Sequence, residues 1–202
     1  TRLRRALTEG VDADGSFNRI TVDSDTCTSD TVAILANGRA GGRAIDSPAG
    51  RGGKFIEALA DLCRDLARQV IADGEGAEHV IRVTVTGARS DRDARRAARS
   101  VADSPLVKTA VHGADPNWGR LVMAVGKSGA KVEPARLTVS IGRTRVFHAG
   151  EPTRFDAARV SRTMMAAEVP IEVDLGQGEG RCVYLGCDLS RDYIRINADY
   201  TT

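Results

Sequence analysis

Hydrophobic and polar residues follow two different periods along this chain. Between Lys54 and Ala72 the apolar residues recur at intervals of three and four, which predicts a long amphipathic helix. The apolar positions of this helix are Phe55, Leu59, Leu62, Leu66 and Val70. The glycines of 73–76 (DGEG) end it. From His79 to Gly87 the pattern changes to alternation, which predicts a strand.

The same two periods predict the other elements. Helical spacing recurs in four segments, 2–10, 90–100, 118–125 and 155–167, with Ser90 as an N-cap. Strand patterns occur at 16–23, 105–112, 169–175 and 181–184, and a hairpin over 137–148 turns at Gly142-Arg143. An apolar run at 31–36 precedes a glycine-rich stretch, 38–53, that is expected to be a loop. This order of elements is typical of a layered α/β fold without a linker that would divide it.

Composition and charge narrow the function classes. The chain is 42% apolar and 28% charged, as globular proteins are, and no apolar run approaches the ~18 residues of a membrane span. Its 29 basic and 27 acidic residues leave a net charge of +2, so no nucleic-acid partner is expected. The first residues show no signal peptide, and the four cysteines lie too far from histidines for a zinc site. We expect a reduced, cytoplasmic protein with no metal, in which Cys63 is a core residue.

Three positions carry candidate chemistry, each with a plainer structural alternative. Glu75 lies between two glycines just past a helix end, where it could contact a ligand or simply be solvated in a capping loop. The segment 115–120 (DPNWGR), close to His112, is either a rigid turn that presents polar side chains or a packed corner. Thr1 could be a nucleophile whose hydroxyl proton is accepted by its own α-amine, which has a usual pKa of ~8. Alternatively, threonine is the first residue of the sequence only by chance. A calcium loop starting at Asp23 is excluded, because its sixth and twelfth positions lack glycine and glutamate.

Four separated segments together resemble one family. They are SFNRITVDSDTCTSDT (16–31), ADGEGA (72–77), SPLVKTAVHGADPNWGR (104–120) and DYIRINADYTT (192–202). In this order they are similar to the C-terminal (β) chain of glutamate N-acetyltransferase, also called ornithine acetyltransferase, of arginine biosynthesis. The resemblance runs from about residue 2 to the end, so residues 1–202 are expected to be a single β-chain unit.

The resemblance implies a fold, a partner and a reaction. Family members cleave their own precursor before a threonine, and the β chain completes its fold with the separate N-terminal α chain, usually as a heterotetramer of two α and two β chains. The fold is that of the DmpA-type N-terminal-nucleophile aminopeptidases, a layered α/β structure. The freed threonine takes an acetyl group from N-acetylornithine and passes it to glutamate, without a metal or an organic cofactor. The oxyanion donors lie on the α chain.

The resemblance also assigns site residues. It makes Thr1 the candidate nucleophile, Glu75 the contact for the substrate's ammonium group, and Asn197 and Thr202 the C-terminal substrate contacts. In the family, however, the threonine opens an apolar strand that precedes a helix, whereas here 2–5 (RLRR) follow Thr1 directly. Two interpretations stay open: Thr1 is the nucleophile, or the nucleophile lies outside this sequence.

Three other functions compete with acetyl transfer to glutamate. One is a related acyltransferase of a secondary-metabolite pathway that uses another amine donor or acceptor. The second is a DmpA-type aminopeptidase or amidase, against which the segments 115–120 and 197–202 (NADYTT) argue. The third is a non-catalytic subunit that binds its partner without a nucleophile of its own.

Overall fold

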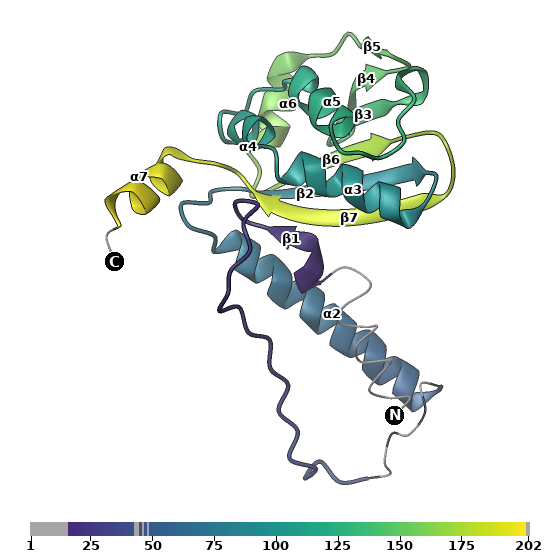
Figure 1. Ribbon diagram of the computed structural model, residues 1–202, viewed down its shortest axis with the longest axis vertical. Coiled ribbons are helices and arrows are strands. Elements are labelled where there is room, and N and C mark those ends of the chain that lie inside the picture. Colours follow the sequence, from purple (N-terminus) through teal and green to yellow (C-terminus); the bar gives the residue numbers. More distant parts are fainter. Residues whose placement is uncertain (1–15, 43–44, 46, 48, 201–202) are drawn as a thin grey trace.

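The computed structural model describes residues 16–42, 45, 47 and 49–200. Within these residues the fold is built on one mixed sheet with helices on both faces (Figure 1). In spatial order the strands are β1 (Ile20–Thr21), β7 (Gly180–Cys187), β2 (Val80–Ala88), β6 (Glu168–Asp174), β3 (Thr138–Ile141), β4 (Thr144–His148) and β5 (Glu151–Pro152). β1 runs parallel to β7 and β2 parallel to β6, while the other neighbours are antiparallel. The expectation of a layered α/β fold is confirmed.

The side chains of β2 divide the core between the two faces of the sheet. Ile81, Val83 and Val85 have no solvent exposure and lie in the main core. Four helices pack over this core: α3 (Asp91–Ala102), α4 (Pro105–His112), α5 (Trp118–Gly126) and α6 (Ala157–Met164). Val80 belongs to a second, smaller cluster with Cys187 and with Ile71 of α2 (Arg51–Ala72). Each such fully buried side chain contributes roughly 1.5–3 kcal/mol of hydrophobic stabilisation.

The C-terminal helix α7 (Arg191–Asp199) stands off the sheet, at the left of Figure 1. None of its residues is buried, so packing against the core does not fix its position. Two short 3₁₀ turns, η2 (Phe17–Arg19) and η3 (Pro134–Arg136), complete the elements. Among the described residues, no helix combines the length and the apolar character needed to cross a membrane.

Most of the elements predicted from periodicity are present. β2, α3, α5, α6, β6 and the β3–β4 hairpin lie within a few residues of their predicted limits. Ser90 caps α3 as expected, because its side chain accepts a hydrogen bond from the Asp93 N–H at 3.2 Å. Cys63 is 4% exposed, which confirms its prediction as a core residue. α2 begins at Arg51, earlier than predicted, and the helix expected at 2–10 lies outside the described residues.

One predicted strand was wrong, and another is shorter than predicted. The segment 105–112 is helix α4: Pro105 occupies its first turn, and Val107 and Val111, four residues apart, share the buried face. The strand expected at 16–23 is reduced to Ile20–Thr21, because a 3₁₀ turn occupies the residues before it.

Candidate active site

The loop between α2 and β2 places Glu75 beside the start of α7. The next residue, Gly76, has a φ of +63°, in the left-handed region that favours glycine. A Cβ there would lie 2.5 Å from the backbone nitrogen of Tyr193 and 2.9 Å from Oγ of Ser190. The Ser190 hydroxyl donates to the Gly76 carbonyl at 2.6 Å. The loop and the helix therefore meet backbone to backbone, which only glycine allows at this position.

Glu75 and Asn197 are in direct contact although they are 122 positions apart in the sequence. Nδ2 of Asn197 donates to Oε2 of Glu75 at 2.7 Å and to the Tyr193 carbonyl at 3.0 Å. Both side chains are exposed, so a ligand can reach them. A carboxylate that accepts from an ammonium group thus lies beside an amide that can both donate and accept. Of the predicted site residues, the structure brings these two together, while Thr1 and Thr202 lie outside the described residues.

Tyr193 adds a second link between α7 and the body of the chain. Its hydroxyl donates to Oδ2 of Asp23 at 3.0 Å. Burial, the hydrogen bond to Asp23 and the charges of Asp23, Glu75 and Asp25 raise the pKa of Tyr193 to about 12. The phenol is therefore protonated at neutral pH. The three carboxylates also make this surface negative, which suits a substrate that carries an ammonium group.

A buried lysine lies under this cluster. Lys108 of α4 is 2% exposed, and its ammonium group donates to the carbonyls of Val22 and Cys187 at 2.5 Å each. Burial lowers the pKa of Lys108, while Cys187 and, more weakly, Asp103 and Asp188 act in the opposite direction. Lys108 thereby links Val22, the residue before Asp23, to Cys187 at the end of β7.

A buried carboxylate ties the same region together from the other side. Asp188 is 3% exposed, and its Oδ1 accepts from the backbone N–H groups of Glu78 and His79 at 2.9 and 2.8 Å. Its Oδ2 lies 2.9 Å from Nδ1 of His112. His112, noted in the sequence for its neighbourhood, therefore helps to hold the Glu75 loop through Asp188.

Periodicity did not single out Asp23, Tyr193, Lys108 or Asp188 as members of one site. The signal for Lys108 was a cation between the apolar neighbours Val107, Ala110 and Val111 on one helix face. Asp188 and Tyr193 are five residues apart, but Asp23 is 170 positions from Tyr193, and only the meeting of the two segments brings it to them.

The segment 115–120 forms a packed corner. The Asn117 side chain caps α5, its Oδ1 accepting from the Arg120 N–H at 3.3 Å, and its Nδ2 donates to the Asp115 carboxylate at 3.2 Å. Trp118 stacks on Phe147 with ring centroids 5.5 Å apart. The Arg120 guanidinium donates to α4, at the Leu106 carbonyl and the Thr109 hydroxyl. These contacts favour the structural alternative for this segment.

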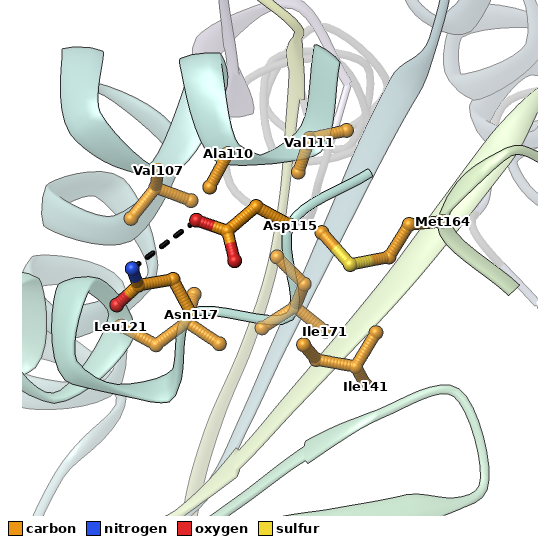
Figure 2. A pocket seen from close by; sticks show the side chains of 9 residues that line it. All are labelled: Val107, Ala110, Val111, Asp115, Asn117, Leu121, Ile141, Met164 and Ile171. Carbon is orange, nitrogen blue, oxygen red and sulfur yellow. Dashed lines mark hydrogen bonds between the residues drawn. The ribbon is translucent and has the colours of Figure 1, made fainter. Parts of the chain in front are cut away.

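A small hollow opens beside this corner (Figure 2). Asp115 and Asn117 lie in it among apolar side chains from α4, α6 and the sheet, including Val107, Met164 and Ile171. It encloses about 10 Å³, roughly the room that one water molecule needs. Its lining includes neither Glu75 nor Asn197, so it is separate from the cluster at α7. No group of three or more His, Cys, Asp or Glu side chains in the described part of the chain is placed to hold a metal ion.

The whole chain, residues 1–202, matches the sequence model of the ArgJ family. The chain belongs to the ArgJ family. Two relatives named arginine biosynthesis bifunctional protein ArgJ, from Deinococcus radiodurans and Rhizobium meliloti, are 52% and 48% identical to it. The family resemblance drawn from the four sequence segments is confirmed.

An ArgJ structure confirms the fold. The crystal structure of arginine biosynthesis bifunctional protein ArgJ from Bacillus halodurans matches with a TM-score of 0.92 at 41% identity, over 98% of this chain and 92% of the solved chain. The matches to the Deinococcus and Rhizobium ArgJ relatives cover 93% and 98% of this chain but only 46% and 49% of the relatives. This chain therefore spans about half the length of those ArgJ proteins.

Proposed function

We propose that this chain is the C-terminal half, or β chain, of a cytoplasmic ornithine acetyltransferase that moves an acetyl group from N-acetylornithine to glutamate. The observation that carries the proposal is the exposed pair of Glu75 and Asn197, held together where the α2–β2 loop meets α7. Family membership supports the reaction class, because the relatives are named for arginine biosynthesis.

Substrate binding uses the charges of this surface. The ammonium group of N-acetylornithine takes the place of the Asn197 amide at the Glu75 carboxylate, and the nearby Asp23 and Asp25 favour its approach. Asn197, released from Glu75, then hydrogen-bonds other polar groups of the substrate. Thr202 is the remaining proposed contact from this chain.

The reaction proceeds by two acyl transfers through one nucleophile. The hydroxyl oxygen of the N-terminal threonine, for which Thr1 is the candidate in this sequence, attacks the acetyl carbonyl of N-acetylornithine. The hydroxyl proton passes by way of the threonine's own α-amine to the leaving nitrogen, which frees ornithine and leaves an acetyl ester on the threonine. The amine of glutamate then attacks the ester, forming N-acetylglutamate and restoring the hydroxyl. No metal or organic cofactor takes part in these steps.

The proposed enzyme needs a second chain. The α chain, made from the N-terminal half of the same precursor, supplies the oxyanion donors, and two α and two β chains assemble. The coverage figures support this division, because this chain covers 92% of a solved ArgJ chain but less than half of the Deinococcus protein.

Intact-mass spectrometry of the protein made from its full-length gene tests the reaction. Incubation with N-acetylornithine is expected to add one acetyl group to an N-terminal threonine, and glutamate is expected to remove it. Glu75→Gln should strongly reduce acetylation at low substrate concentration, because the amide cannot pair with an ammonium group.

Glu78→Gln is the matched control, since Glu78 is an exposed residue of the same loop whose backbone, and not its side chain, contacts Asp188. It should behave like the wild type. Absence of an adduct on a cleaved chain would refute acetyl transfer from N-acetylornithine. Equal behaviour of the Glu75→Gln and Glu78→Gln variants would refute the role of Glu75.

A further inference from the structure

The linker between β7 and α7, residues 188–190 (DLS), lies along the loop between α2 and β2. Asp188 binds one end of that loop: its backbone N–H donates to the carbonyl of His79 at 3.0 Å, and its carboxylate accepts from two backbone N–H groups of the loop. Two residues further along the linker, the Ser190 hydroxyl donates to the Gly76 carbonyl at 2.6 Å. The linker and the loop are therefore joined at two separate points.

Ser190 serves both the loop and the helix with a single hydroxyl group, and it is only 4% exposed. Besides donating to Gly76, its oxygen accepts from the Tyr193 N–H at 3.1 Å and so forms the N-cap of α7. A hydroxyl has one proton, which is committed to the carbonyl of the loop, while a lone pair of the same oxygen holds the helix. One atom thus connects the residue after Glu75 to the first turn of the helix that carries Asn197.

Packing against the core does not replace these bonds, because α7 has no buried residue. Helix α3 shows the contrast. Ser90 caps α3 in the same way, accepting from the Asp93 N–H at 3.2 Å, but α3 also buries five of its side chains. Loss of the cap on α3 therefore leaves that helix in place, whereas the position of α7 relative to the loop depends on polar contacts such as those of Ser190.

We propose that Ser190 is a positioning residue for the acetyl transfer: through its two hydrogen bonds it sets the spacing between Glu75 and Asn197. The inference rests on the proposed function for its reaction, and it assigns no substrate contact to the buried Ser190 hydroxyl. Without this hydroxyl, Glu75 and Asn197 stay on their own elements but are no longer held at one separation. The substrate then binds well only to the fraction of molecules in which both groups are correctly placed, and its apparent affinity falls by that fraction.

Steady-state kinetics of the enzyme made from its full-length gene test this role. Ser190→Ala should raise the KM for N-acetylornithine about tenfold while kcat stays within about threefold, because substrate that has bound is already correctly placed. Ser190→Thr keeps a hydroxyl on a residue that caps helices well, so it should restore KM to within about threefold of the wild type. Ser90→Ala is the matched control: it removes the equivalent cap from α3, at the opposite end of β2 from the loop of Glu75, and should leave KM unchanged.

A further variant and a measurement without substrate keep the test independent of folding and of the reaction. Ser190→Gly retains most of the capping but lacks the donor to the Gly76 carbonyl, so it should raise KM as Ser190→Ala does, and it replaces the alanine variant if circular dichroism shows that one unfolded. Hydrogen exchange of the free enzyme should be about tenfold faster at the amides of 193–199 in Ser190→Ala than in the wild type. In Ser90→Ala it should be unchanged there.

The results separate the positioning role from the proposed function. Equal KM values for Ser190→Ala and Ser90→Ala would overturn the positioning role, and so would a folded Ser190→Thr variant as impaired as Ser190→Ala. A wild-type enzyme that forms no acetyl adduct with N-acetylornithine would refute the proposed function instead. Hydrogen exchange would then decide about Ser190 alone: faster exchange of α7 in Ser190→Ala supports its hold on the helix, and unchanged exchange overturns it.

Discussion

Replacement of Gly76 by alanine should separate Glu75 from Asn197 in the candidate active site. A Cβ at this position would lie 2.5 Å from the Tyr193 backbone nitrogen, about 0.9 Å inside the 3.4 Å at which ordinary contact begins. The obstacle is backbone at the start of α7, which cannot rotate away as a side chain could. Alanine also has to adopt the left-handed conformation at φ +63°, which costs roughly 1–2 kcal/mol.

The response of the molecule to Gly76→Ala follows from how α7 is attached. Because α7 has no buried residue, the helix moves more readily than the core, by about the 1 Å that the new methyl group requires. Asn197 then leaves Glu75. A displacement of this size in a substrate-positioning group costs roughly a hundredfold in rate, so kcat/KM for N-acetylornithine should fall by about that factor. The enzyme should still fold, since the strain of about 2 kcal/mol is small beside a typical stability of about 5–15 kcal/mol.

Gly74→Ala is the matched control for this substitution. Gly74 lies in the same loop, but its φ is not in the left-handed region, and a Cβ would meet its nearest neighbours only at 3.3 Å and 3.4 Å. We expect kcat/KM within about threefold of the wild type, because the neighbours need to move by only a few tenths of an ångström. Steady-state kinetics of the three proteins, with circular dichroism to confirm folding, make the comparison. If Gly76→Ala retained the activity of Gly74→Ala, the argument that close approach at Gly76 positions α7 would be refuted.

Two further substitutions probe the surrounding polar contacts. Tyr193→Phe removes the hydrogen bond to Asp23, worth about 1 kcal/mol at this exposed site, so KM should rise about fivefold. Because the pKa of Tyr193 is about 12, the pH profile of kcat/KM should keep its shape below pH 10, and an unchanged KM would contradict the link. For Glu168, burial acts to raise the pKa, but Arg82 and Arg68 outweigh it and lower the pKa below its usual value. The stability that these pairs supply is complete above the usual carboxyl pKa and lost as the pH falls through the lowered one. Between pH 6 and pH 3, chemical denaturation of the wild type should therefore lose about 1 kcal/mol more than that of Glu168→Gln, and equal losses would count against these ion pairs.

Periodicity predicted those helices and strands whose buried and exposed positions follow a regular pattern along the sequence. β2 alternates between two faces of a covered sheet, and α3 begins at a capping serine, so local sequence was sufficient for both. The segment 105–112 was harder, because a stretch of eight residues with apolar side chains at Leu106, Val107, Ala110 and Val111 fits either period. Pro105 at the first helical turn was the local signal that favoured a helix.

The candidate site depended on a different kind of information. Nothing local connects Glu75 with Asn197, and they were paired only because the sequence resembles a family whose motifs contain both. Lys108 and Asp188 were not predicted, since their roles depend on which loops converge at the end of β7. Helix α2 shows the same limit, because helical spacing predicts its apolar residues Phe55, Leu62 and Leu66 but does not say that they are 42% to 53% exposed in this chain.

Lys108 and Asp188 anchor three loops together, and this shared support affects how substitutions can change the substrate preference of the site. These two buried groups hold the residue before Asp23, the loop of Glu75 and the start of the α7 segment at the same time. Substitutions in separate loops are then coupled through a common support, and their free energies should deviate from additivity by about 0.5–3 kcal/mol. In such an arrangement a single replacement mainly disturbs the positions of all three loops. Substrate preference therefore changes through paired replacements in different loops.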